Sequence, residues 1–371
     1  MDMPGRICGF LRRHRRKFIF AGVLVGGVVG TVKYAQYKIK DWMVQEEKRY
    51  LEELRKQQHF EKTQEHCFAI AQAVANTLKD NILQQIDTEA ILDSLKTEVS
   101  AERKLELWNE LKVVVFAKVS ISIYILTLSI VIIRLQLNHL AAKVYASTLT
   151  DQSPPINDVI QRWFLSISHE FVLDNGLECI IKEFTKISQD LTESMPLQCR
   201  VRGADIESVL KSIHNQIRQH GSFSFHVKSS ENDSNNILDL LLPNEANVNF
   251  GASVDLDLQR QLINEMWDIF DSNDCMQVFE SCIFKSFKNF AKIDGSIIDS
   301  LGTHSKALVS DITPIIRTNS DFLPLAKVLP MLNSHVHAIS HENFIRKVLT
   351  NPMLTKFSAN IYQSFTDTIS C

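Results

Sequence analysis

The chain contains neither glycine nor proline from Thr31 to Ser153, an interval of 123 residues. These two residue types supply the special backbone angles of tight turns, so a fold of many short strands needs them at short intervals. Their absence excludes a turn-rich β architecture for this third of the chain and favours long helices. Apolar residues in the interval recur at helical spacing, as in Cys67, Ala71, Val74 and Leu78.

The remainder of the chain continues the helical pattern. We expect helices around residues 156–190, 204–220, 256–294, 300–317, 321–340 and 342–368. Asp87-Thr88 and Ser100 stand where helix-capping residues are favoured. The segment 226–239 is polar and rich in Ser and Asn, which predicts a loop. The sequence therefore predicts an all-α protein, in which a single N-terminal membrane anchor precedes a bundle of long helices.

Composition limits the class of protein. With 371 residues, 45% of them hydrophobic, the chain is long enough to bury a large core. Residues 1–17 carry a formal charge of +5, and because the whole chain sums to −3, the remainder carries −8. A mildly acidic body does not suit nucleic acid. The seven cysteines are scattered without a C-x-x-C pair, which favours free thiols in a reducing compartment.

A short apolar segment follows a basic cluster at the N-terminus. Phe18–Val32 would span about 22 Å as a helix, less than a hydrocarbon core of about 30 Å. Extension to Tyr37 gives 20 residues, provided that Lys33 reaches the interface. We therefore expect a basic tail at 1–17, a transmembrane anchor at 18–37 and a helical bundle domain at 38–371, which the family resemblance described below places in the cytosol. The expected targeting residues are Arg12, Arg13, Arg15, Arg16 and Lys17, and the expected anchor residues are Phe18, Gly22, Gly26, Gly30 and Tyr34.

Two other readings of this segment remain open. A secretory signal has the same order of basic and apolar residues, and Val28-Val29-Gly30 offers a weak cleavage site. A mitochondrial presequence should be amphipathic, whereas this run is apolar on all sides. The free cysteines favour the retained anchor. Its glycines follow a G-x-x-x-G-x-x-x-G pattern that permits close helix dimerisation, although glycine is common in membrane helices in general.

A second apolar run, Val113–Ile133, has the length of a membrane span. It contains Lys118 and several Ser and Thr residues, and the central helix of an all-α protein is also hydrophobic on all sides. We favour a buried helix over a second span.

No pattern in the chain predicts catalysis or a bound cofactor. His335, His337, His341 and Glu342 form a histidine-rich stretch, but without the H-E-x-x-H order of a zinc site. We interpret these histidines as polar surface residues and expect no metal. Neither a G-x-S-x-G motif, a P-loop nor a dinucleotide-binding fingerprint occurs.

Several ordered segments resemble the peroxisomal biogenesis factor 3 (peroxin-3) family. The likeness begins with the basic N-terminus and short anchor and covers nearly the whole chain, except for about 195–255. It is carried by QHFEKTQEHC (58–67), KLELWNELK (104–112), RLQLNHLAAKVY (134–145), LPLAKVLPMLNSHVHAI (323–339) and FSANIYQSF (357–365).

This resemblance implies a membrane receptor and not an enzyme. Family members are anchored in the peroxisomal membrane, hold a helical domain in the cytosol and dock peroxin-19, the chaperone that delivers newly made membrane proteins. The resemblance also implies a surface groove for an amphipathic helix of peroxin-19, formed by Leu95, Lys96, Lys104, Leu105 and Trp108. Cargo membrane proteins are further expected partners. An organelle tether, or an adaptor for inheritance or turnover, is compatible with the same architecture.

The residues alone leave the role of Trp108 open. Lys104, Leu105, Trp108 and Lys112 fall on one helical stripe that is apolar and flanked by lysines. Such a stripe usually faces a core, in which case Trp108 is a core residue and the lysines are solvated. The resemblance favours the groove.

Overall fold

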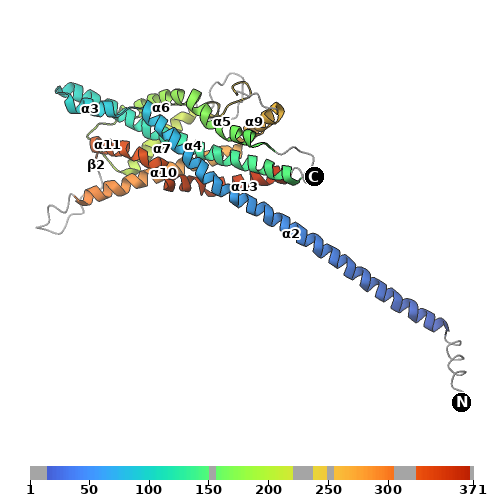
Figure 1. The fold of residues 1–371 in the computed structure, drawn as a ribbon. Helices are drawn as coiled ribbons and strands as arrows, with labels where there is room; N and C mark the ends of the chain where they lie inside the picture. The colour runs from blue at the N-terminus through green and yellow to red at the C-terminus, as the bar shows by residue number, and fades with distance from the viewer. Residues whose placement is uncertain (1–14, 150–155, 220–236, 249–254, 305–322, 368–371) are drawn as a thin grey trace, which may run out of the picture. The chain divides into compact units, whose positions relative to one another are not determined.

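The computed structural model describes residues 15–149, 156–219, 237–248, 255–304 and 323–367. The chain divides into two units, 1–59 and 60–371, and each is described by itself. Figure 1 shows the helices of the second unit gathered around α4.

The described elements are almost all helices. In chain order they are α2 (Arg15–Gln85), α3 (Glu89–Thr97), α4 (Ala101–Leu149), α5 (Asp158–Phe171), the π-helical turn η1 (Val172–Gly176), α6 (Leu177–Thr192), β1 (Arg200–Val201), α7 (Gly203–Gln219), α8 (Ile237–Leu241), α9 (Leu256–Phe270), α10 (Asn273–His304), β2 (Leu323–Pro324), α11 (Leu325–His335), the 3₁₀ turn η2 (Val336–Ser340), α12 (Glu342–Leu349) and α13 (Pro352–Asp367). The all-α prediction is confirmed. The strands β1 and β2 form one short antiparallel pair, with Val201 opposite Leu323.

Several predicted helices are divided. The segment 156–190 comprises α5 and α6 with η1 between them, and 342–368 comprises α12 and α13. The loop predicted at 226–239 is wrong for its last residues, because α8 begins at Ile237 and buries Ile237 and Leu238. Residues 226–236 and 305–317 lie outside the described part of the chain.

Gly176 ends the π-helical turn where η1 meets α8. A β-carbon at this position would lie 2.1 Å from the backbone carbonyl oxygen of Leu240. No side chain fits at that distance, so glycine allows the backbones of η1 and α8 to approach closely.

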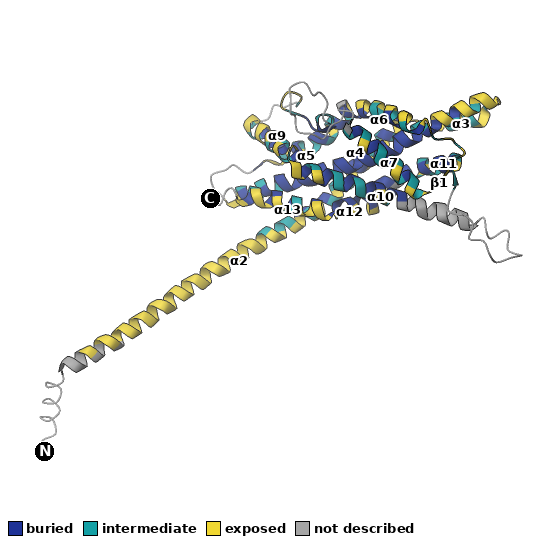
Figure 2. Cartoon of the chain, turned by 180° about the vertical axis from the view of Figure 1, so that it is seen from behind, coloured by how far each residue is buried: buried dark blue, intermediate teal, exposed yellow. Residues whose placement is uncertain are grey.

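Helix α4 is the centre of the second unit. It contacts α3, α5, α6, α7, α10, α11, α12 and α13, and Figure 2 shows it as buried over most of its length. Its β-branched residues are not strong helix formers, so the helix depends on burial within the bundle. Among the described helices, α4 alone is long and apolar enough to cross a membrane, and its most apolar window is entirely buried. The expectation of a buried helix at Val113–Ile133 is confirmed.

Polar side chains of α4 connect it to the surrounding helices. Asn138 accepts a hydrogen bond from Gln64 of α2 at 2.7 Å. Arg134 donates to the carbonyl oxygen of Leu349 at 2.6 Å and to the hydroxyl of Ser358 at 3.0 Å. Because a buried polar group without a partner is costly, each bond favours one register of α4 against its neighbours.

The carboxylate of Glu265 on α9 contacts two further polar side chains of α4. This carboxylate lies 2.7 Å from Nε2 of His139 and 2.6 Å from Nζ of Lys143. Burial raises the pKa of Glu265, but hydrogen bonds from His139, Lys143 and Gln261 outweigh it and lower the pKa to about 2. The carboxylate therefore stays charged well into the acid range.

The five described cysteines are free thiols, in agreement with the sequence. Cys67, Cys275 and Cys282 are buried. Burial raises the pKa of Cys67 to about 11 and that of Cys282 to about 12. These thiols are unreactive core residues.

We expect a fragment comprising residues 41–371 to be helical and soluble without detergent, because the apolar surface of α4 is covered by other helices. Its helical content is measured by circular dichroism, and its membrane affinity by flotation with liposomes. The full chain, which retains the predicted anchor, should float. A fragment that requires detergent would indicate that Val113–Ile133 contacts lipid.

The buried His214 of α7 gives the domain a defined sensitivity to acid. Its Nδ1 is hydrogen-bonded to the Tyr124 hydroxyl. Burial, and to a lesser extent the nearby Arg218, which is ion-paired with Glu280 at 2.9 Å, lower the pKa of His214 from 6.5 to about 4. Between these values the unfolded chain binds the proton and the folded chain does not, so the free energy of unfolding falls as the pH falls from 6.5 to 4, by about 3 kcal/mol at most.

Thermal unfolding followed by circular dichroism tests this dependence. We expect His214→Gln, which keeps an acceptor for Tyr124 but does not titrate, to lose much of the decrease in melting temperature between pH 6.5 and 4. The decrease below pH 4 should persist, because Glu265 titrates there. An unchanged slope in the variant would show that another group is responsible.

Candidate functional site

Helix α3 and the first turns of α4 form a helical hairpin, which we call the α3–α4 hairpin (residues 87–110). The two helices contact each other and are joined by residues 98–100. One carboxylate oxygen of Glu98 accepts hydrogen bonds from the backbone N–H groups of Ser100 at 3.0 Å and Val99 at 2.9 Å, which lower the pKa of Glu98. Hydrogen bonds therefore fix the short connection between the helices.

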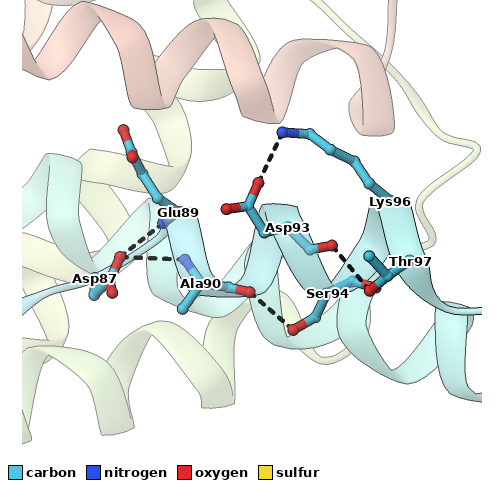
Figure 3. Close-up of polar contacts among 7 residues, drawn as sticks. All are labelled: Asp87, Glu89, Ala90, Asp93, Ser94, Lys96 and Thr97. Atoms are coloured by element: carbon cyan, nitrogen blue, oxygen red, sulfur yellow. Dashed lines mark hydrogen bonds and ion pairs between the residues drawn. The ribbon is translucent and has the colours of Figure 1, made fainter.

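The beginning of α3 is capped by Asp87, as Figure 3 shows. Its Oδ1 accepts from the backbone N–H groups of Glu89 at 2.9 Å and Ala90 at 3.2 Å. These groups have no partner within the helix, so the bonds stabilise its first turn. The capping prediction is confirmed for Asp87, whereas the neighbouring Thr88 hydroxyl makes no capping bond.

The five residues expected to bind a partner all lie on the α3–α4 hairpin. Leu95 is half-buried on α3, and Trp108 is half-buried on α4; both pack against the edge of the core. Leu105 is 57% exposed. Lys104 is half-buried and Lys96 is exposed. Trp108 is therefore neither a fully buried core residue nor a free surface residue.

Lys96 is engaged in an exposed ion pair, drawn in Figure 3. Its Nζ lies 2.8 Å from Oδ1 of Asp93, and this hydrogen bond raises the pKa of Lys96. Exposed pairs of this kind contribute little to stability. Lys96 can therefore exchange Asp93 for a carboxylate on a partner at little cost.

Three apolar residues of the hairpin were not anticipated. Val99, in the connection, is 91% exposed. Ile91 and Leu92 are half-buried and pack against the core on the same side of α3 as Leu95. Their spacing from Leu95, four and three residues, is the signal that could have identified them. A single valine in a polar connection gives no such signal.

Lys112, at the end of the Trp108 stripe, is not solvated, in contrast to what the core interpretation of that stripe requires. Lys112 is only 3% exposed, and its Nζ donates to the backbone carbonyl oxygen of Met195 at 2.8 Å. Burial lowers the pKa of this amine. Lys112 forms part of the wall of a cleft of about 590 Å³ between α4 and α6, which is also lined by Asn109, Glu110, Val113, Val114, Thr185, Gln189 and Glu193.

The predicted anchor lies within α2, which continues beyond it to Gln85. Gly26 and Gly30 have open space where a β-carbon would lie, and Tyr34 is 67% exposed. The side chain of Phe18 and the surroundings of Gly22 lie outside the described set. The same holds for the side chains of all five expected targeting residues, Arg12, Arg13, Arg15, Arg16 and Lys17.

The histidine-rich stretch does not form one helix. His335 ends α11, His337 lies in η2 and His341 precedes α12. His337 and His341 are exposed, and Glu342 pairs with Arg346 at 2.6 Å. Within the described ranges, no three His, Cys, Asp or Glu residues are grouped closely enough to hold a metal ion.

Comparison with known proteins gives a consistent result over nearly the whole chain. A family model described as Peroxin-3 matches residues 9–103, 96–155 and 148–364. The chain is 29% identical to human peroxisomal biogenesis factor 3 over 97% of both chains, and 29% identical to the bovine protein over 96% of both. It is 24% identical to peroxisome biogenesis protein 3-1 of Arabidopsis thaliana, over 95% of this chain and 97% of the plant protein.

Proposed function

The chain belongs to the peroxin-3 family, and from this premise we propose that it is a peroxisomal membrane receptor that docks the chaperone peroxin-19. The family consists of peroxisome biogenesis factors rather than enzymes. Docking would allow peroxin-19 to release its cargo membrane proteins at the peroxisomal membrane.

The observation that carries this proposal is the partly exposed apolar surface of the α3–α4 hairpin. We define the docking surface as Leu95, Lys96, Val99, Lys104, Leu105 and Trp108. Recognition of an amphipathic helix relies on a few apolar anchors in a groove between helices. Leu105 and Val99 expose apolar area to solvent, and Trp108 offers a large ring that is already held in place by the core. Such a residue binds without losing much side-chain entropy.

The charges around this surface favour a partner helix with acidic residues at its edges. Lys96 and Lys104 flank the apolar residues on α3 and α4. Lysines at the edge of an interface mainly accelerate association and set orientation, while the central apolar contacts supply most of the affinity. We therefore assign the dominant contribution to Trp108.

The N-terminal part of α2 would hold the receptor in the bilayer. In this proposal residues 1–17 form the targeting tail, 18–37 span the membrane and 38–371 face the cytosol. The rule that positive charge stays in the cytosol would favour the reverse orientation. Lys33, Lys38 and Lys40 follow the apolar segment and reduce this asymmetry.

Trp108→Ala tests the docking surface directly. We expect it to keep helical content and melting temperature close to those of the wild type, because Trp108 lies at the edge of the core. Peroxin-19 binding, measured by calorimetry, should weaken by about 2–4 kcal/mol, roughly 30- to 1,000-fold.

Trp163→Ala is the matched control for this test. Trp163 is a half-buried tryptophan that packs against the core from α5, outside the docking surface. Its loss should change the melting temperature about as little as the loss of Trp108 and leave binding unchanged. Unfolding of Trp108→Ala, or unchanged binding by it, would remove Trp108 from the docking surface.

Residues 1–40 should suffice to direct a fluorescent protein to peroxisomal membranes and to keep it there during carbonate extraction. The basic cluster and the short apolar segment are the targeting features of this region. Replacing Arg12, Arg13, Arg15 and Arg16 by serine should abolish the targeting while leaving the apolar segment intact. Diffuse or extractable fluorescence from the unmodified fusion would contradict the proposed anchor.

A further inference from the structure

Lys118 is a buried amine in the most apolar part of the chain. It lies on α4 with only 5% of its surface exposed. A buried ammonium group is strongly destabilising unless it is hydrogen-bonded and compensated by opposite charge. Its Nζ donates to the hydroxyl oxygen of Thr88 at 3.0 Å. Burial lowers the pKa of Lys118, while Asp87 and Glu89, at the start of α3, favour its charged form.

Thr88 connects this amine to a third element. Its hydroxyl donates to Oδ1 of Asn333 on α11 at 2.9 Å. Thr88 itself is only 1% exposed. A threonine immediately before a helix normally caps it. Here Asp87 performs the capping, so the Thr88 hydroxyl is available to join Lys118 and Asn333. We call these three residues the Thr88 hub.

Helix α3 has few other attachments to the domain. None of its residues is fully buried, as the colouring of α3 in Figure 2 indicates. Its apolar contacts come from the half-buried Ile91, Leu92 and Leu95. A helix of nine residues is too short to be stable alone in water. Local opening of α3 therefore depends strongly on how Thr88, the residue immediately before the helix, is held.

We propose that the Thr88 hub is a positioning element, which keeps α3 ordered against α4 so that the docking surface is complete before peroxin-19 binds. This inference rests on the proposed docking function. None of the three residues belongs to the docking surface. Thr88 lies immediately before the first residue of α3. Its carbonyl oxygen accepts a hydrogen bond from the Leu92 N–H at 3.2 Å, in the first turn of the helix.

The hub acts on affinity through the fraction of molecules in which α3 is ordered. When the binding-competent state is only partly populated, the apparent dissociation constant rises in inverse proportion to its population. Loss of the hub should therefore weaken binding even though every contact residue remains. A general role in core packing would instead lower the stability of the whole domain.

Thr88→Val and Thr88→Ser are the matched variants, tested in the full-length chain in detergent micelles. Valine has the shape of threonine but cannot hydrogen-bond, whereas serine keeps the hydroxyl. Hydrogen exchange of α3 amides is measured without partner, and affinity is measured with purified peroxin-19. We expect Thr88→Val to speed exchange in α3 and to weaken binding about tenfold. Thr88→Ser should remain close to the wild type in both measurements.

Each outcome has a defined meaning. Unchanged exchange in α3, or faster exchange with unchanged affinity, overturns the proposal. If Thr88→Val lowers the melting temperature of the whole domain, Lys118→Met is tested, because it removes the buried charge that the valine leaves unpaired. Loosening confined to α3 in that variant, with weaker binding, supports the hub, and global unfolding in both variants overturns it. Failure of the docking function itself is recognised separately, because the wild-type chain would then not bind peroxin-19 at all. Trp108→Ala does not touch the hub, so unchanged binding by that variant contradicts the assigned docking surface and not the hub.

Discussion

The burial of α4 on every side is the constraint on which the rest of the structure depends. A helix that is apolar all round must be covered by other helices. Helices α3, α5, α6, α7, α10, α11, α12 and α13 all contact α4 and contribute to that cover. Apolar contact alone would allow many registers. The polar side chains Lys118, Arg134, Asn138 and His139 each require a particular partner, so they select one arrangement of the surrounding helices.

The proposed docking surface depends on this arrangement, because α4 begins outside the bundle and becomes buried only after its first turns. Its exposed start carries Lys104 and Leu105, whereas Leu107 and Leu111 are buried. A binding surface on a helix that continues into a packed core is held more rigidly than one on a loop. Helix α3 has no such continuation, and its position depends on the capping by Asp87 and on the buried hydroxyl of Thr88.

Sequence patterns were sufficient where the structure of a segment depends on residues nearby in the chain. An internal lysine and recurring serine and threonine residues predicted Val113–Ile133 as a buried helix. The five groove residues on the α3–α4 hairpin were named from the family resemblance and not from local patterns. Sequence patterns failed where a residue is buried or hydrogen-bonded by a partner that is distant in the chain. Lys112 is buried because Met195, 83 positions later, offers a carbonyl oxygen. The Thr88 hydroxyl is engaged by Asn333, 245 positions away, and no local spacing predicts that contact. Helix α8 could not be predicted from a polar segment, because its burial depends on its contact with η1.

The order of the elements in the chain has a consequence for synthesis. Ribosomes produce α4 before most of the helices that cover it, and α13, which packs extensively against α4, is the last element described. Chains generally fold as units while they are made from the N-terminus. Here the nascent polypeptide must carry an incompletely covered helix of 49 residues, apolar enough to be mistaken for a membrane span, until α13 has emerged. Termination before α13 would leave the face of α4 that α13 contacts exposed to water, and we expect such truncated products to be aggregation-prone.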